Sequence, residues 1–146
     1  MKTITAALLA LLLSSCSAET DNAQAKEWET LNTEVMSLYK QGRYDRAVVV
    51  ANKALEVAER ALGPDQPSVA TSLNNLASLY DTQGQYAQAE PLYKRSLTIR
   101  EKALGPDHPD VAGSPENMAQ LFRATNRGEE AAKFEKRAAR IRAIKR

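Results

Sequence analysis

Few side chains of this sequence have the types and spacing that catalysis requires. His108 is the only histidine and Cys16 the only cysteine. One histidine without a cysteine partner does not form a metal site, because such sites need several ligands. The sequence also shows no Ser/His/Asp set, no paired inward carboxylates, no glycine-rich phosphate loop and no Cys-x-x-Cys pair. We therefore predict a protein that is not an enzyme and that holds no metal and no cofactor.

The N-terminal residues have the pattern of an export signal. Lys2 supplies a positive charge, the run from Ile4 to Leu13 is apolar, and small residues follow. That run is too short to span a bilayer as a helix. We expect residues 1–15 to form a signal peptide.

Cys16 follows Leu13-Ser14-Ser15, and these four residues resemble the lipobox of bacterial lipoproteins. The resemblance implies that Cys16 is lipidated and becomes the N-terminus of an exported protein anchored in the envelope and facing the periplasm. Lipidation would also remove an unpaired thiol from an oxidising compartment. Ser17 stands where an aspartate would retain a lipoprotein in the inner membrane, which favours the outer membrane. Two alternatives stay open: cleavage after Ala18, giving a soluble periplasmic or secreted protein, or an uncleaved segment with an incidental cysteine.

Composition limits the remaining possibilities. Residues 16–26 are polar without apolar periodicity, which predicts a flexible tether. The chain is 43% hydrophobic but only 5% aromatic, so the core must be built mainly from alanine, leucine and valine. Its 20 basic and 18 acidic residues nearly balance, so the net charge does not indicate binding to nucleic acid or to a membrane.

The chain from residue 27 onward repeats itself every 42 residues. The segment Gly63 to Ala70 returns as Gly105 to Ala112, and Gln41-Gly42-Arg43-Tyr44 returns as Gln83-Gly84-Gln85-Tyr86. Within each unit the apolar residues form two runs at helical spacing. A period of this length predicts stacked helix pairs. We expect an all-α solenoid of three antiparallel helix pairs, with repeats at about 27–68, 69–110 and 111–146.

Glycine and proline mark the expected helix ends. Gly84 lies between the two runs of the middle repeat, where a helix end favours positive φ. Gly63 and Gly105 end the second helices, and Pro67 and Pro109 suit the first turn of the helices that follow.

The third repeat departs from the pattern. Asn126 replaces the turn glycine and tolerates positive φ, so we expect the turn to survive. Ser114 and Pro115 are expected to be the cap and first residue of a helix that starts late. The last helix, about 129–145, carries an apolar stripe of Ala131, Phe134, Ala138 and Ile141.

Several segments resemble the tetratricopeptide repeat family in its 42-residue form, which is found in kinesin light chains and many bacterial proteins. They are Leu73-Asn74-Asn75-Leu76-Ala77, Gly84-Gln85-Tyr86, Ala87-Gln88-Ala89-Glu90-Pro91-Leu92-Tyr93 and Leu104-Gly105-Pro106-Asp107-His108-Pro109. The resemblance covers residues 27–146. It implies that the first helix of each pair lines a concave groove, and that the protein is a scaffold or adaptor binding a partner protein or peptide there.

The residues expected on the groove side are mostly polar. Asparagine amides supply a donor and an acceptor, which suits the backbone of an extended peptide. Asn75 and Asn117 could equally satisfy a neighbouring helix backbone, and the two roles are not exclusive. Lys40 and Arg123 favour an acidic peptide, but Asp81 and nearby glutamates oppose them, so the sequence does not assign the groove an acidic specificity. The expected groove residues are Asn32, Met36, Tyr39, Lys40, Asn74, Asn75, Ser78, Asp81, Asn117, Gln120 and Arg123.

The C-terminal segment from Arg123 to Arg146 contains nine basic residues against three glutamates. Such a helix could lie on anionic headgroups. The same charges also complement the helix dipole and solvate an outer face. The alternative function is therefore a structural or self-associating envelope subunit, such as a homo-oligomer, whose basic helix contacts a membrane or partner. Nucleic acid is not expected, because an exported protein does not meet it and only one aromatic residue, Phe134, lies among the charges.

Overall fold

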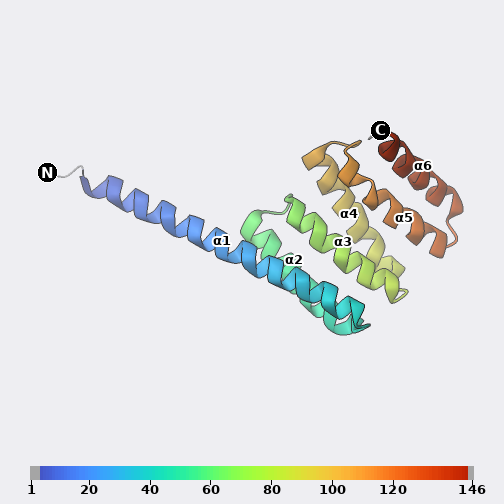
Figure 1. Cartoon of the computed structure of the whole chain (residues 1–146), viewed down its shortest axis with the longest axis horizontal. Coiled ribbons are helices and arrows are strands. Elements are labelled where there is room, and N and C mark those ends of the chain that lie inside the picture. The colour runs from blue at the N-terminus through green and yellow to red at the C-terminus, as the bar shows by residue number, and fades with distance from the viewer. Residues whose placement is uncertain (1–3, 145–146) are drawn as a thin grey trace.

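The computed structural model describes the backbone of residues 4–144 and the side chains of residues 20–144, residue 21 excepted. Over residues 4–144 the fold is all-α, and its helices pack as consecutive antiparallel pairs, α1 with α2, α3 with α4 and α5 with α6 (Figure 1). The predicted fold class is therefore confirmed. The elements are α1 (Ile4–Lys40), α2 (Tyr44–Leu62), α3 (Pro67–Thr82), α4 (Tyr86–Leu104), the 3₁₀ turn η1 (Pro109–Val111), α5 (Gly113–Ala124) and α6 (Gly128–Ile144).

A buried alanine recurs at one position in the second helix of every pair. Ala47 and Ala89 are 0% exposed and Ala131 is 2% exposed. Leu79 clusters with Ala47, and Leu121 clusters with Ala89 and Ala131. A small side chain at a contact lets two helix axes approach closely. The core thus runs through the stack as neighbouring clusters of small and branched side chains.

The turns inside the three pairs have the same backbone geometry. Gly42, Gly84 and Asn126 have φ values of 71°, 74° and 59°. At each turn, the N–H of the following residue donates to a carbonyl five positions back, with N···O distances of 2.9, 2.8 and 2.7 Å. This pattern satisfies helix-end carbonyls through a residue in the left-handed region. The prediction that the turn survives at Asn126 is confirmed.

The start of α5 differs from the prediction. Ser114 is not the cap: α5 begins at Gly113 after Ala112, and the Ser114 hydroxyl is buried without a hydrogen-bond partner among the described residues. The reason lies in Pro109, which starts η1 rather than α5. Because Ala112 has helical backbone angles (φ −54°, ψ −35°), no extended residue precedes α5 from which a side chain could cap it. The late start itself is confirmed, since α5 has 12 residues and α3 has 16.

α6 packs on α5 and ends the stack as expected, and its bounds fall within one residue of the predicted helix. Ala131, Ala138 and Ile141 are buried, and Phe134 is half-buried against the core. The predicted apolar stripe therefore faces the stack.

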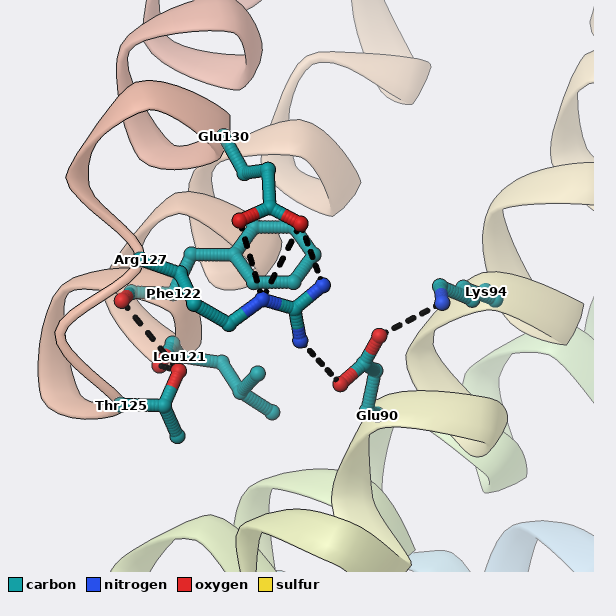
Figure 2. Close-up of polar contacts among 7 residues, drawn as sticks. All are labelled: Glu90, Lys94, Leu121, Phe122, Thr125, Arg127 and Glu130. Carbon is teal, nitrogen blue, oxygen red and sulfur yellow. Dashed lines mark hydrogen bonds and ion pairs between the residues drawn. The ribbon is translucent and has the colours of Figure 1, made fainter.

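Arg127, in the turn before α6, joins the third pair to the second (Figure 2). Its Nη1 donates to Glu90 Oε2 of α4 at 2.7 Å, and its Nε donates to both carboxylate oxygens of Glu130 at 3.0 Å. Its guanidinium lies 4.3 Å from the centre of the Phe122 ring. Glu90 also accepts from Lys94 Nζ at 2.5 Å. One arginine thus connects α4, α5 and α6.

The N-terminal part of α1 extends beyond the stacked pairs (Figure 1). Residues 16–26, expected to be a flexible tether, are helical and continuous with the rest of α1, which has 37 residues and a length of about 55 Å. The side chain of Cys16 is outside the described set, so its lipidation stays a prediction. In the part of the chain that the structure covers, no helix is both long enough and apolar enough to cross a membrane.

Candidate peptide-binding groove

A groove of about 250 Å³ lies along the first helices of the three pairs. It contains six of the eleven predicted residues. Val35 and Leu79 also line it, although neither was among the predicted groove residues. Both belong to apolar helical stripes. Val35 is four positions from Tyr39, and Leu79 is four positions from Asn75, so each lies on the same helix face as a predicted groove residue. This spacing is the only sequence signal that could have predicted them. The lining residues are Val35, Met36, Tyr39, Asn74, Asn75, Ser78, Leu79 and Asn117.

Asparagine pairs connect the first helices across the groove. Asn75 Nδ2 donates to Asn32 Oδ1 of α1 at 2.6 Å, and Asn117 Nδ2 of α5 donates to Asn74 Oδ1 at 2.8 Å. Both pairs are 43 residues apart, so the same contact recurs at each junction between repeats. The expectation that these amides bond to the backbone of a neighbouring helix is wrong, because both bonds join two side chains. Asn32 does not line the groove, but it is bonded to Asn75, which does.

The two pairs leave part of the amide chemistry of α3 unused. An asparagine side chain offers two N–H donors and a carbonyl acceptor. Asn74 uses only its carbonyl and Asn75 only one N–H. Among the described residues nothing else bonds to the Asn74 N–H groups or the Asn75 carbonyl. Adjacent residues of the central helix thus present a free donor and a free acceptor in the groove.

Beneath these amides the groove is apolar. Val35 is 2% exposed and Leu79 is 0% exposed, whereas Met36 is 44% exposed. Tyr39 packs edge-on against Tyr44, with ring centroids 5.5 Å apart, and its hydroxyl lies 3.3 Å from Thr82 Oγ1. These two contacts restrict the Tyr39 side chain to one orientation at the end of the groove.

Asp81 does not line the groove and instead interacts with Tyr93 of α4. Burial raises the pKa of the Asp81 carboxyl, and the hydrogen bond from Tyr93 opposes that rise. Burial and the charge of Asp81 raise the pKa of Tyr93, while a hydrogen bond with Ser78 lowers it. The Tyr93 side chain is 3% exposed and stays protonated at neutral pH. Sequence reasoning missed Tyr93, because its position on a second helix gives no sign that it contacts Ser78.

Three further predicted residues lie away from the groove lining. Lys40 and Gln120 are exposed. Arg123 Nη2 forms an ion pair with Glu135 Oε1 of α6 at 2.5 Å. Of the third repeat, only Asn117 lines the groove.

The third repeat also contains a carboxylate at the position of Asn74. This residue, Glu116, pairs through Oε1 with Arg142 Nη2 of α6 at 2.6 Å. Charges on α5 that could have acted on a ligand are therefore neutralised by the last helix.

The arginines of the basic C-terminal segment contact acidic residues of the stack. Arg137 of α6 pairs with Glu101 of α4, and Arg140 Nη2 lies 2.9 Å from Asp107 Oδ1. Arg123, Arg127 and Arg142 have carboxylate partners as described above. Of the basic residues within 123–144, only Lys133 and Lys136 lack an ion-pair partner among the described residues. Lys145 and Arg146 lie outside the described residues. The pairing accounts for most of the basic charge without a membrane.

The described side chains contain no cluster of three or more histidine, cysteine, aspartate or glutamate residues that could hold a metal ion. Tyr93, which forms a hydrogen bond with Ser78 of the groove, has the Asp81 carboxylate beside it. The groove offers amide, hydroxyl and apolar contacts to a ligand.

Solved structures show the same architecture. BtubC (BKLC) from P. vanneervenii is 27% identical with a TM-score of 0.75, and the match covers 80% of this chain and 47% of that one. A putative kinesin light chain from Podospora anserina with TPR-like repeats is 23% identical with a TM-score of 0.71, over 79% of this chain and 55% of that one. The chain thus spans about half the length of these two proteins.

A third similar structure is closer in size. The TPR domain of Arabidopsis FLU is 17% identical with a TM-score of 0.71, over 82% of this chain and 98% of that one. A comparison with curated proteins gives no match. The tetratricopeptide repeat family matches residues 29–102 and 82–143. Because these matches span most of the sequence, the chain belongs to the tetratricopeptide repeat family.

Proposed function

We propose that the protein is a non-catalytic adaptor that holds an extended segment of a partner protein in the groove of α1, α3 and α5. Tetratricopeptide repeat domains are generally protein–protein interaction modules. The observation that carries the proposal is the free donor of Asn74 beside the free acceptor of Asn75. One peptide unit has a C=O and an N–H that match this pair.

An extended segment uses these amides better than a compact ligand does. Its peptide groups lie along the chain, so one can bond to α3 while a side chain enters the apolar part of the groove. The volume of about 250 Å³ is below the usual range for small-molecule sites, about 300–1,000 Å³. It accommodates one or two side chains of a longer segment.

We further propose that the protein is exported and anchored in the envelope, with lipid on Cys16 and the groove facing the periplasm. The lipobox-like sequence before Cys16 supports this proposal. The helical stretch from Cys16 to Leu31 would place the stack about 20 Å from the anchor. An outer-membrane location is preferred because Ser17 stands in place of an aspartate.

The groove proposal is tested by crosslinking in cells that express the full chain, followed by affinity capture. Substituting Asn74→Ala with Asn75→Ala should abolish capture of the partner that the unaltered chain retains. Asn52→Ala is the matched control, because Asn52 is an exposed asparagine of α2 outside the groove. Circular dichroism checks that the groove variant stays folded. Equal capture by all three folded chains would contradict the groove as the binding site.

The anchor proposal needs a separate measurement. The intact mass of the membrane-fraction protein should correspond to a chain that begins at Cys16 and carries a diacylglyceryl and an acyl group. Cys16→Ser should abolish this product. A soluble chain that begins at Glu19 would instead show cleavage after Ala18 and would exclude the lipid anchor.

A further inference from the structure

We infer that the groove selects an uncharged partner segment and places one apolar side chain of that segment against Met36, above the buried Val35 and Leu79. This inference rests on the proposed function and specifies the chemistry of the partner. The inferred partner segment differs from the acidic peptide that Lys40 and Arg123 would favour. Neither of these two residues lines the groove.

The first support is the absence of charge at the groove surface. None of the eight lining side chains is charged at neutral pH. Glu116 and Arg123, which precede and follow Asn117 on α5, are paired with Arg142 and Glu135. A charged side chain entering the groove would lose hydration without meeting an opposite charge.

The remaining charged groups near the groove do not change this conclusion. Asp81 is half-buried and hydrogen-bonded to Tyr93 rather than facing a ligand. Lys40 is exposed at the end of α1, where water and salt screen it. Charge complementarity therefore favours a neutral segment.

The second support is the apolar surface beside the amides. Four large hydrophobic side chains are exposed among the described residues, namely Met36, Val49, Leu104 and Ile144, and of these only Met36 lines the groove. Below Met36, the buried side chains of Val35 and Leu79 are closely packed and cannot be displaced at low cost. The flexible methionine can adapt to an incoming apolar group. A neutral segment with an apolar side chain would thus cover Met36 while its backbone bonds to Asn74 and Asn75.

The experiment selects binders from a displayed library of random linear peptides on the full chain. Enriched peptides should share an apolar residue within an uncharged stretch. Their dissociation constants should change less than about twofold between about 0.05 and about 0.5 M salt, because no ion pair forms. Met36→Glu should weaken their binding by about tenfold or more. Val49→Glu is the matched control and should leave binding unchanged, because Val49 is 71% exposed on α2 and lies outside the groove.

The possible outcomes separate this inference from the function on which it rests. Enrichment of acidic peptides that bind more weakly in high salt and require Lys40 would overturn the inference and leave the adaptor function standing. Unchanged binding of neutral peptides to Met36→Glu would also overturn it. If the folded chain enriches no peptide sequence, the proposed groove function itself fails, and the inference fails with it.

Discussion

Arg137 of α6 pairs with Glu101 of α4 at the repeat position where Arg95 of α4 pairs with Glu59 of α2. The two contacts are related by the 42-residue period, and Arg95 Nη2 lies 2.6 Å from Glu59 Oε1. The side chains of Arg137 and Glu101 are 27% and 28% exposed, so solvent screens their attraction only in part. The same ion pair therefore joins the second helices at both junctions between repeats.

Removal of Arg137 should destabilise the stack. Arg137→Ala leaves the Glu101 carboxylate partly buried without its partner, and we expect a loss of about 1–3 kcal/mol in the free energy of unfolding. Lys133→Ala is the control, because Lys133 lies on the same helix without an ion-pair partner among the described residues, and it should change stability by less than about 0.5 kcal/mol. Urea denaturation measures both. Equal stabilities of the two variants would show that the pair contributes nothing.

The Glu90 contacts should contribute to acid sensitivity. Hydrogen bonding to Lys94, and secondarily to Arg127, lowers the pKa of the Glu90 carboxyl below its usual 4.5. A carboxyl with a lowered pKa in the folded state stabilises the fold above its unfolded-state pKa, and this contribution is lost as pH falls through the folded-state pKa. Glu90→Gln should therefore lower stability at neutral pH and make it less dependent on pH below about 4.5. Denaturation at several pH values measures this slope, and an unchanged slope would contradict the assignment.

The asparagine pair between α1 and α3 should show measurable coupling. Asn32→Ala, Asn75→Ala and the double variant form a mutant cycle around the 2.6 Å bond. We expect a coupling energy of about 0.5–1.5 kcal/mol, which is typical of a net protein hydrogen bond. Pairing Asn32→Ala with Asn52→Ala, whose side chain bonds within α2, provides a cycle that should be additive. If both cycles are additive, the amides do not hold α1 and α3 together.

The basic last helix should not act as a membrane anchor. In a Cys16→Ser background, Lys133→Glu with Lys136→Glu should leave co-sedimentation with anionic vesicles unchanged. These two lysines are chosen because they lack ion-pair partners in the described part of the chain, so their reversal keeps the arginine contacts intact. A lower bound fraction for the double variant would instead support the alternative in which α6 contacts a membrane.

The helix pairs and their turns followed from local sequence signals. The turns at Gly84 and Asn126 require only residues that tolerate positive φ. Pro67 begins α3 because its missing N–H costs little in the first turn of a helix. The start of α5 was predicted less well. Its geometry depends on how η1 continues into Ala112, and the same Gly-Pro-Asp-x-Pro lead-in precedes both α3 and α5.

The groove was predictable only in part. Met36, Tyr39, Asn74, Asn75, Ser78 and Asn117 line it as helical periodicity predicts, but the direction of Lys40 and Arg123 was not predictable from periodicity. A side chain near the edge of a helix can turn toward either neighbour, and Arg123 turns to Glu135 because α6 brings a carboxylate within reach.

The sequence by itself determined the 42-residue period, the three helix pairs and the amide-rich face of the first helices, because these depend on residue type and spacing along one helix. Only the tertiary structure decided that Asn75 bonds to Asn32, that Glu116 pairs with Arg142 and that Tyr93 reaches Ser78. These contacts depend on the rotation and offset between packed helices. Residues one or two helices apart meet only after the pairs stack, so no pattern within a single repeat records them.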